Sequence, residues 1–260
     1  MPITVHYEVN GGGEPLILIG GLSANCREWQ HVTPWLKESF TVYTPENRGA
    51  GLTSGWASGF TIEDMADDIA AFIEIHGLES ACVVGHSMGG AIVQRLCILH
   101  PERVKAAVIA SSFCKFPKAA QLYIENTSEL LATGVPMDLV LRTIYTRLYG
   151  NQFLSNSLSV ESEQERMLTD PVPQTPEGYQ AQVKAIGKFD SRTDLARITC
   201  PVLILNGLDD ILTPTWLSEE LHQNIGHSTL KLIPECGHMI PQEKPEEFAR
   251  YISNFLVSVY

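Results

Sequence analysis

Basic residues are scarce in this chain of 260 residues, which has 18 Lys and Arg against 30 Asp and Glu and a formal net charge of −12. Nucleic acids and anionic membranes attract proteins with basic surfaces. The charge balance therefore argues against both as partners. It does not exclude an acidic substrate, because a local basic patch can oppose the net charge.

Long apolar runs, paired cysteines and targeting signals are also missing. No apolar stretch approaches the length of a membrane span, and residues 1–8 lack the basic and apolar regions of a secretory signal. The six cysteines are scattered, without the C-x-x-C pairs that are typical of redox and zinc sites. We therefore expect a cytoplasmic protein with reduced cysteines, and its oligomeric state stays open.

What the sequence does contain is an alternation of strands and helices. Apolar and often β-branched residues predict strands at 3–9, 15–19, 40–44, 81–84, 104–110, 201–205 and 229–233. Helical spacing of apolar residues lies between several of them, most clearly after Thr61, where Thr61-x-x-Asp64 predicts a capping box. Alternating units of this kind predict the α/β class, with a doubly wound, mostly parallel sheet.

The middle of the chain has a different character. Strand signals vanish between residues 111 and 197, residues 122–149 are expected to be helical, and a polar stretch with three prolines follows. An interval this long without strands is too long for a simple crossover. We therefore predict an α/β core of residues 1–112 and 198–260, into which residues 113–197 are inserted as a helical cap.

The motif G-H-S-M-G at residues 85–89 stands between a predicted strand and a predicted helix. This context is typical of the G-x-S-x-G nucleophile elbow. A serine on so sharp a turn has a strained backbone, so its neighbours two residues away must be small, as Gly85 and Gly89 are. Gly90 lets the helix begin close to the strand. Ser87 is therefore the candidate nucleophile.

A serine hydroxyl needs a base that is itself oriented by a carboxylate. His238 is the candidate base, because it follows the last predicted strand and open α/β sheets have their sites at the carboxyl edge. His86 is set aside, since adjacent strand residues point to opposite sides. The candidate acid is Asp209 or Asp210, in the loop after the strand at 201–205.

Two backbone amides are needed for the oxyanion of an acyl-transfer intermediate. Met88, the residue after the nucleophile, supplies one. The second is expected from Leu22, because the glycines at 20–21 let this loop approach the nucleophile closely.

Taken together, the motifs resemble those of the α/β-hydrolase superfamily, specifically its small Ser-His-Asp esterases and lactonases with a helical lid. In that family the acid follows a glycine by three residues, and Gly207-x-x-Asp210 matches this spacing. The resemblance therefore assigns the acid to Asp210. Gly237-His238 matches the family's histidine loop. The resemblance covers essentially the whole chain, and it implies the α/β-hydrolase fold with a helical cap inserted after the sixth strand.

Two positions depart from the family pattern. Glu46 stands where the family's D-x-R-G-x-G loop begins with Asp, and we assign Arg48 in this loop no catalytic role. Gly20 stands where many relatives have His before the oxyanion glycine, but backbone donation does not need that side chain.

His86 before the serine is more typical of an esterase or lactonase than of a carbon–carbon bond hydrolase, which often has Asn there.

The function implied is that of a serine hydrolase (carboxylesterase-like) acting on a carboxylic ester or lactone. Ser87, His238 and Asp210 form the catalytic triad and pass through an acyl-enzyme. The amides of Leu22 and Met88 form the oxyanion hole. No metal or organic cofactor is expected. Hydrolysis of a diketone carbon–carbon bond, a carrier-protein methyl esterase and a non-catalytic ligand receptor remain as alternatives.

The substrate is expected to be a small molecule held between core and cap. The expected lining residues are apolar and lie at helical spacing in the cap: Leu122, Ile124, Leu130, Leu139, Ile144 and Tyr145. Basic residues of the cap region would allow an acidic acyl carrier protein as partner, although solvated surface charges are the favoured explanation for them: Arg142, Arg147, Arg166, Lys184, Lys188 and Arg192.

Overall fold

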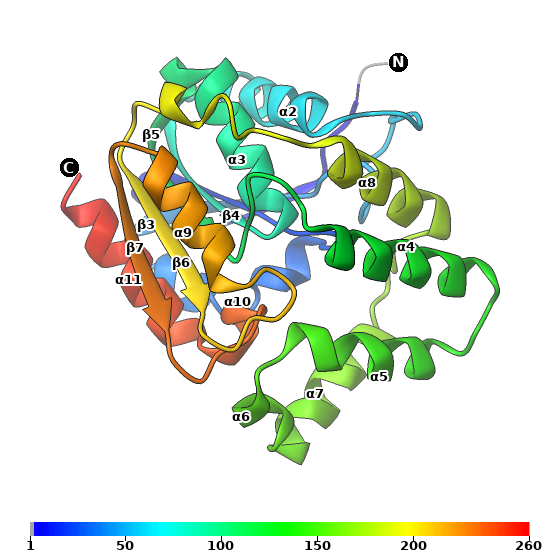
Figure 1. Ribbon diagram of the computed structural model, residues 1–260. Coiled ribbons are helices and arrows are strands. Elements are labelled where there is room, and N and C mark those ends of the chain that lie inside the picture. Colours follow the sequence, from blue (N-terminus) through cyan, green and yellow to red (C-terminus); the bar gives the residue numbers. More distant parts are fainter. Residues whose placement is uncertain (1–2, 260) are drawn as a thin grey trace.

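The computed structural model describes residues 3–259 and contains a seven-stranded sheet in the order β1-β3-β2-β4-β5-β6-β7 (Figure 1). The strands are β1 (Tyr7–Gly11), β2 (Glu14–Ile19), β3 (Phe40–Pro45), β4 (Ala81–His86), β5 (Val104–Ala110), β6 (Val202–Gly207) and β7 (Ser228–Ile233). Among the seven strands of residues 3–259, only β1 pairs antiparallel with its neighbour. The predicted mostly parallel sheet is confirmed, while residues 1–2 and 260 of the predicted core lie outside the described residues.

The first strand begins later than its alternating pattern predicts. Thr4 forms an isolated antiparallel bridge with Ser54, and the amide of His6 donates to Thr53 Oγ1 over 3.0 Å. Regular pairing with β3 starts only at Tyr7. The alternation in residues 3–9 therefore reflects contact with a loop as well as with the sheet.

Helices cover both faces of the sheet. The helical segments of the core are η1 (Cys26–Trp29), α1 (Thr33–Leu36), α2 (Ile62–Ile75), α3 (Met88–Leu99), η2 (Pro101–Arg103), η3 (Leu195–Arg197), α9 (Thr215–Asn224), α10 (Ile240–Glu243) and α11 (Pro245–Val257). In β2, Ile17 and Ile19 pack towards α2, α3 and α9, while Leu16 and Leu18 pack towards η1, α1, α10 and α11. This alternation is what a strand buried on both faces requires.

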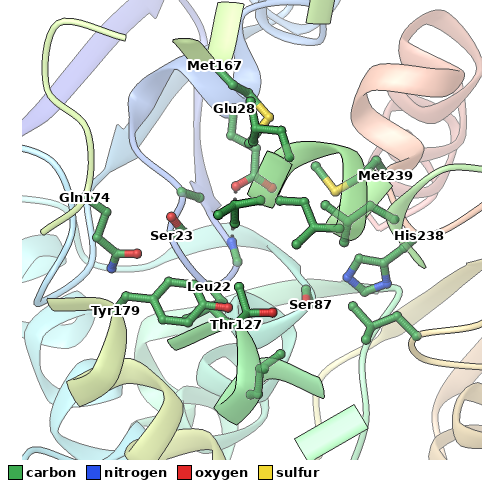
Figure 2. Close-up of a pocket in the computed structure, with 18 of the residues that line it drawn as sticks. Leu22, Ser23, Glu28, Ser87, Thr127, Met167, Gln174, Tyr179, His238 and Met239 are labelled. Carbon is green, nitrogen blue, oxygen red and sulfur yellow. Dashed lines mark hydrogen bonds between the residues drawn. The ribbon is translucent and has the colours of Figure 1, made fainter. Parts of the chain in front are cut away.

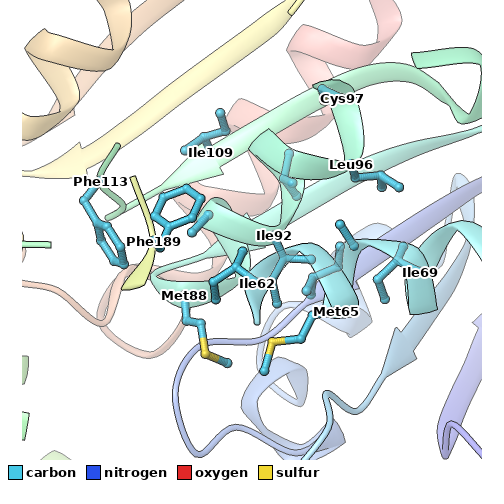
Figure 3. Packing of buried hydrophobic residues seen from close by; sticks show 14 of the residues in the cluster. Ile62, Met65, Ile69, Met88, Ile92, Leu96, Cys97, Ile109, Phe113 and Phe189 are labelled. Carbon is cyan, nitrogen blue, oxygen red and sulfur yellow. The ribbon is translucent and has the colours of Figure 1, made fainter. Parts of the chain in front are cut away.

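Helix α3 begins directly after the candidate nucleophile and is held by its neighbour α2. The predicted capping box at the start of α2 is confirmed: Thr61 Oγ1 accepts from the Asp64 amide over 3.3 Å, and Asp64 Oδ2 accepts from the Thr61 amide over 2.7 Å. Met65 and Ile69 of α2 pack in one buried cluster with Ile92 of α3 (Figure 3). The packing fixes the direction in which α3 leaves the sheet.

The segment between β5 and β6 is helical, as predicted. It contains α4 (Lys118–Ala132), α5 (Met137–Leu148), α6 (Asn151–Leu154), α7 (Ser157–Leu168) and α8 (Pro176–Lys188). The expected helical stretch 122–149 is interrupted at Gly134, whose φ is +72°, a conformation that ends a helix. The insertion follows β5, which is the fifth described strand in chain order rather than the sixth. Figure 1 shows α4 beside α8, with α5, α6 and α7 projecting from the core.

Candidate active site

Ser87 lies between β4 and α3 in a backbone conformation that L-residues rarely adopt. Its φ and ψ are 55° and −118°, and such strain persists only where surrounding contacts impose it. The Ser87 amide continues the sheet by donating to Ala110 O over 2.9 Å, and its carbonyl accepts from Ser112 Oγ over 2.8 Å. These bonds tie the turn to β5.

The glycines around Ser87 are required by close backbone approach. A Cβ on Gly85 would lie 2.2 Å from Gly89 O, and a Cβ on Gly89 would lie 2.0 Å from Ile19 O. A Cβ on Gly90 would lie 2.5 Å from Ser112 Oγ. The structure therefore supplies the steric reason for the glycine spacing of the motif.

Gly89→Ala is expected to destabilise the fold by about 2–3 kcal/mol or more, because backbone and not a flexible side chain occupies the space. Gly226→Ala is the control, since nothing lies within 4 Å of its added Cβ. Urea unfolding of both variants checks this expectation. Equal stability of the two variants would contradict it.

His238 and Asp210 meet in a buried pair. His238 Nδ1 lies 2.9 Å from Asp210 Oδ2, and the two residues are 2% and 4% exposed. Asp210 Oδ1 accepts from the amides of Leu212 and Thr213 over 2.9 and 2.8 Å. The carboxylate is thus fixed as an acceptor, and Nδ1 donates to it. Asp209 is exposed.

Thr213 is a further member of this cluster that sequence reasoning did not find. Its hydroxyl lies 2.7 Å from Asp210 Oδ2 and 3.0 Å from His238 Nδ1. It also lies 3.0 Å from Ser111 O, an acceptor in the loop after β5. The hydroxyl therefore links the acid loop to the segment beside the elbow. The sequence signal that could have identified Thr213 is its place three residues after Asp210.

The loop that carries His238 is held by the acid loop and by the cap. A Cβ on Gly207 would lie 2.2 Å from both Cys236 O and Gly237 O, so the glycine of the acid motif lets the two loops touch. The His238 amide donates to Leu148 O, at the end of α5, over 2.8 Å. The cap therefore positions the histidine as well as covering it.

The loop after β2 approaches Ser87 closely. A Cβ on Gly21 would lie 3.1 Å from Ser87 Cβ, so the next amide, that of Leu22, is near the nucleophile. Met88 is the first residue of α3, and the first amides of a helix have no partner within it. Figure 2 shows Leu22, Ser87 and His238 around one end of a pocket.

His86 and Glu28 form a second buried pair that was not predicted. His86 Nδ1 lies 2.7 Å from Glu28 Oε1, and His86 Nε2 lies 2.8 Å from His238 O. Burial favours the neutral ring, but the hydrogen bond and charge of Glu28 outweigh it and raise the pKa of His86. The argument that His86 points away from the site was wrong, because this residue lines the same pocket.

The pocket between core and cap has a volume of about 430 Å³. Ile124 and Ile144 line it, as predicted. The other expected lining residues were wrong: Leu122, Leu130 and Leu139 are 46%, 38% and 47% exposed, and Tyr145 packs with Tyr149 inside the cap. The walls from the cap that were not predicted include Met137, Val140, Leu141, Leu148 and Met167.

A few polar groups interrupt this apolar lining. Gln174 donates through Nε2 to Gly49 O over 2.7 Å, while its Oε1 has no hydrogen-bond partner within residues 3–259. The Tyr123 hydroxyl likewise has no hydrogen-bond partner within residues 3–259. Both residues line the pocket. Polar groups of this kind orient ligands in otherwise apolar pockets.

Three basic residues of the cap region contact acidic or aromatic side chains of this chain. Arg166 lines the pocket and pairs with Glu163 over 2.6 Å. Arg192 pairs with Asp190 over 2.6 Å, and Arg147 lies over the Tyr123 ring. A carrier-protein partner stays a proposal, since these contacts do not address it.

Within the part of the chain that the structure describes, one group of potential metal ligands lies outside the pocket, formed by His6, Cys26 and Glu46. Glu46 already accepts from the amides of Cys26 and Leu52 over 3.2 and 2.6 Å, and the Cys26 thiol donates to Thr44 O over 3.1 Å. Burial, followed by the charge of Glu46, raises the pKa of Cys26 to about 12. We therefore interpret the cluster as hydrogen bonding that shapes the loop after β3.

Comparison with known families matches residues 14–245 to the alpha/beta hydrolase fold. The chain belongs to this family, and the predicted fold class is confirmed. Among residues 3–259, no helix combines the length and apolar character needed to cross a bilayer.

Similar proteins carry several names. A Mycobacterium tuberculosis protein named non-heme bromoperoxidase BpoC is 30% identical over 99% of each chain, and its crystal structure has a TM-score of 0.91, covering 100% of this chain and 98% of the other. The 3-oxoadipate enol-lactonase 2 of Acinetobacter baylyi is 28% identical over 95% of this chain and 90% of that protein. A thermophilic esterase from Thermogutta terrifontis is 25% identical, with a TM-score of 0.87 over 99% and 94% of the chains. These similarities support a hydrolase.

Proposed function

We propose that this protein is a serine hydrolase that cleaves a carboxylic ester or lactone by way of an acyl-enzyme. The observation that carries the proposal is the buried His238–Asp210 hydrogen bond of 2.9 Å beside Ser87. Both Ser87 and His238 line the same pocket. An imidazole fixed in this way is suited to take a proton from the serine.

In the proposed reaction, His238 removes the hydroxyl proton as Ser87 attacks the carbonyl carbon. Asp210 accepts from Nδ1, so that Nε2 is the free acceptor and the developing imidazolium is stabilised. The amides of Leu22 and Met88 bind the oxyanion. His238 then protonates the leaving oxygen, and a water activated by the same ring releases the acid from Ser87.

Hydrolysis of p-nitrophenyl esters of increasing acyl length tests the proposal. We expect turnover that passes through a maximum at one length, because the pocket is largely apolar and its volume of about 430 Å³ limits the acyl group it can hold. Absence of turnover from folded protein on every ester would contradict an esterase. A diketone as the only hydrolysed substrate would instead support carbon–carbon cleavage, and ligand binding without turnover would support a receptor.

Ile144→Trp is expected to shift the preferred ester towards shorter acyl chains. Ile144 lines the pocket from α5, and a larger ring there fills space that a long acyl group would use. We expect the ratio of kcat/KM for octanoyl over acetyl ester to fall about tenfold or more. Leu139→Trp, on an exposed position of the same helix, is the control. An unchanged ratio in Ile144→Trp would place the acyl group elsewhere.

A further inference from the structure

We propose that Glu28 and His86 act together as positioning residues, holding the oxyanion loop and the loop of His238 in register with Ser87. The inference rests on the proposed hydrolase function. It concerns two side chains that are 6% and 2% exposed and whose hydrogen bonds within residues 3–259 go to Gly21, to each other and to His238 O, and not to Asp210 or the Ser87 hydroxyl. They come from η1 and the end of β4.

The hydrogen-bonding pattern fixes where His86 carries a proton. The carbonyl oxygen of His238 can only accept, so His86 Nε2–H donates to it over 2.8 Å. A second proton lies between His86 Nδ1 and Glu28 Oε1, which are 2.7 Å apart. The pair carries no net charge while it holds both protons, whichever of the two groups binds the second one.

Each end of the pair is attached to a different part of the proposed machinery. Glu28 Oε2 accepts from the Gly21 amide over 3.2 Å, which leaves the amide of Leu22 as the next donor along the loop. His86 holds the carbonyl of His238, whose amide is held by Leu148 O over 2.8 Å. The backbone of His238 is therefore fixed on both sides, once from the core and once from the cap.

Gly20 is coupled to this arrangement. A Cβ at position 20 would lie 2.8 Å from Glu28 Oε2 and 2.6 Å from Ala24 Cβ. The Glu28 carboxylate thus occupies space that a side chain at residue 20 would need. Where many relatives have His at this position, this chain has a glycine and a buried carboxylate that holds the adjacent amide.

The surroundings of the pair set its dependence on pH. The charged and titratable groups that face it are His238 after β7, Asp210 after β6 and Arg166 of α7. Loss of the shared proton would leave the Nδ1 lone pair facing a carboxylate, and the repulsion would push apart the two side chains to which the loops are bound. Glu28 raises the pKa of His86 despite burial. The pair therefore loses the shared proton on the alkaline side of the pH profile.

The test compares Glu28→Gln, Glu28→Ala and His86→Phe with wild type. The Gln amide can donate to neutral Nδ1 while its oxygen accepts from Gly21, so Glu28→Gln is expected within about threefold of wild-type kcat at neutral pH. Glu28→Ala and His86→Phe are expected to lose about 10–100-fold in kcat with little change in KM, since misplaced groups slow the chemistry. Their double variant should lose no more than either single variant.

The pH profile separates positioning from a general structural role. Wild-type kcat should fall on the alkaline side, and that fall should be absent in Glu28→Gln, which has no proton to lose there. Asp68→Asn is the matched control, because Asp68 is a buried carboxylate (8% exposed) paired with Arg48 outside the pocket. A loss of kcat in this control equal to that in Glu28→Ala would overturn the proposal. So would wild-type kcat in Glu28→Ala, or equal impairment of Glu28→Gln and Glu28→Ala.

Labelling of Ser87 by a fluorophosphonate gives a second readout that needs no ester turnover. We expect Glu28→Ala to slow labelling by the same factor as kcat and Glu28→Gln to restore it. If wild type labels readily but hydrolyses no ester, the proposed function fails while the labelling rates still test the pair. If Glu28→Ala does not fold, Glu28→Gln and its alkaline profile decide the question.

Discussion

Ser87→Ala is expected to lower kcat for ester hydrolysis by about 10⁴-fold or more, because the variant has no atom that can form the acyl-enzyme. The fold should survive the change. The Ser87 side chain makes no capping hydrogen bond to α3, and the bonds that fix the turn run through its backbone amide and carbonyl. KM should change little, since the walls of the pocket are retained.

The measurement is p-nitrophenyl ester hydrolysis beside thermal unfolding of the same preparations. Ser128→Ala is the matched control, because Ser128 is also 9% exposed and lies in α4 of the cap without lining the pocket. It should keep wild-type kcat. More than about one hundredth of wild-type turnover in Ser87→Ala would mean that another group is the nucleophile.

The elbow could be predicted from sequence because its constraint is local. Gly85 and Gly89 contact backbone within the turn and at the end of β2, and only glycine fits there. The loops of Asp210 and His238 were predictable for a similar reason, since parallel strands bring their carboxyl ends to one edge. The contact between these loops requires glycine at position 207, because a Cβ there would clash with Cys236 O and Gly237 O.

The Glu28–His86 pair shows where this reasoning stops. The two residues are 58 positions apart, and no periodic pattern relates a short 3-10 turn to the end of a distant strand. A neighbour rule for strands placed His86 on the wrong side, because it ignored the turn that begins at the next residue. Contacts of this kind depend on tertiary approach and not on local propensity.

The cap lining was only partly predictable for another reason. Apolar residues at helical spacing mark a buried face, but each cap helix can bury that face against the pocket, the core or another helix. Ile144 lines the pocket, while Tyr145 beside it packs in the interior of the cap and Leu139 is exposed. Only the placement of α5 over the pocket separates these cases.

Asp210→Asn is expected to lower kcat by about 10⁴-fold at neutral pH while the protein stays folded. The amide oxygen of Asn can still accept from the amides of Leu212 and Thr213, which now bond to Asp210 Oδ1. Its NH₂ group would then face His238 Nδ1 at the position of Oδ2, and two donors cannot share this contact. The ring would therefore carry its proton on Nε2. This nitrogen could then no longer accept the hydroxyl proton of Ser87.

Asp209→Asn provides the matched control, because it makes the same chemical change in the preceding residue, which is exposed. We expect it to keep kcat within about twofold of wild type, as is usual for surface substitutions away from a site. Comparable losses in both variants would mean that negative charge in this loop matters rather than the tautomer of His238. Loss in Asp209→Asn alone would move the acid to the other aspartate, and the 2.9 Å contact of Asp210 with His238 would then be structural. Loss in Asp210→Asn alone is the result that the buried geometry favours, since only this carboxylate has all of its oxygens committed to the loop and the imidazole.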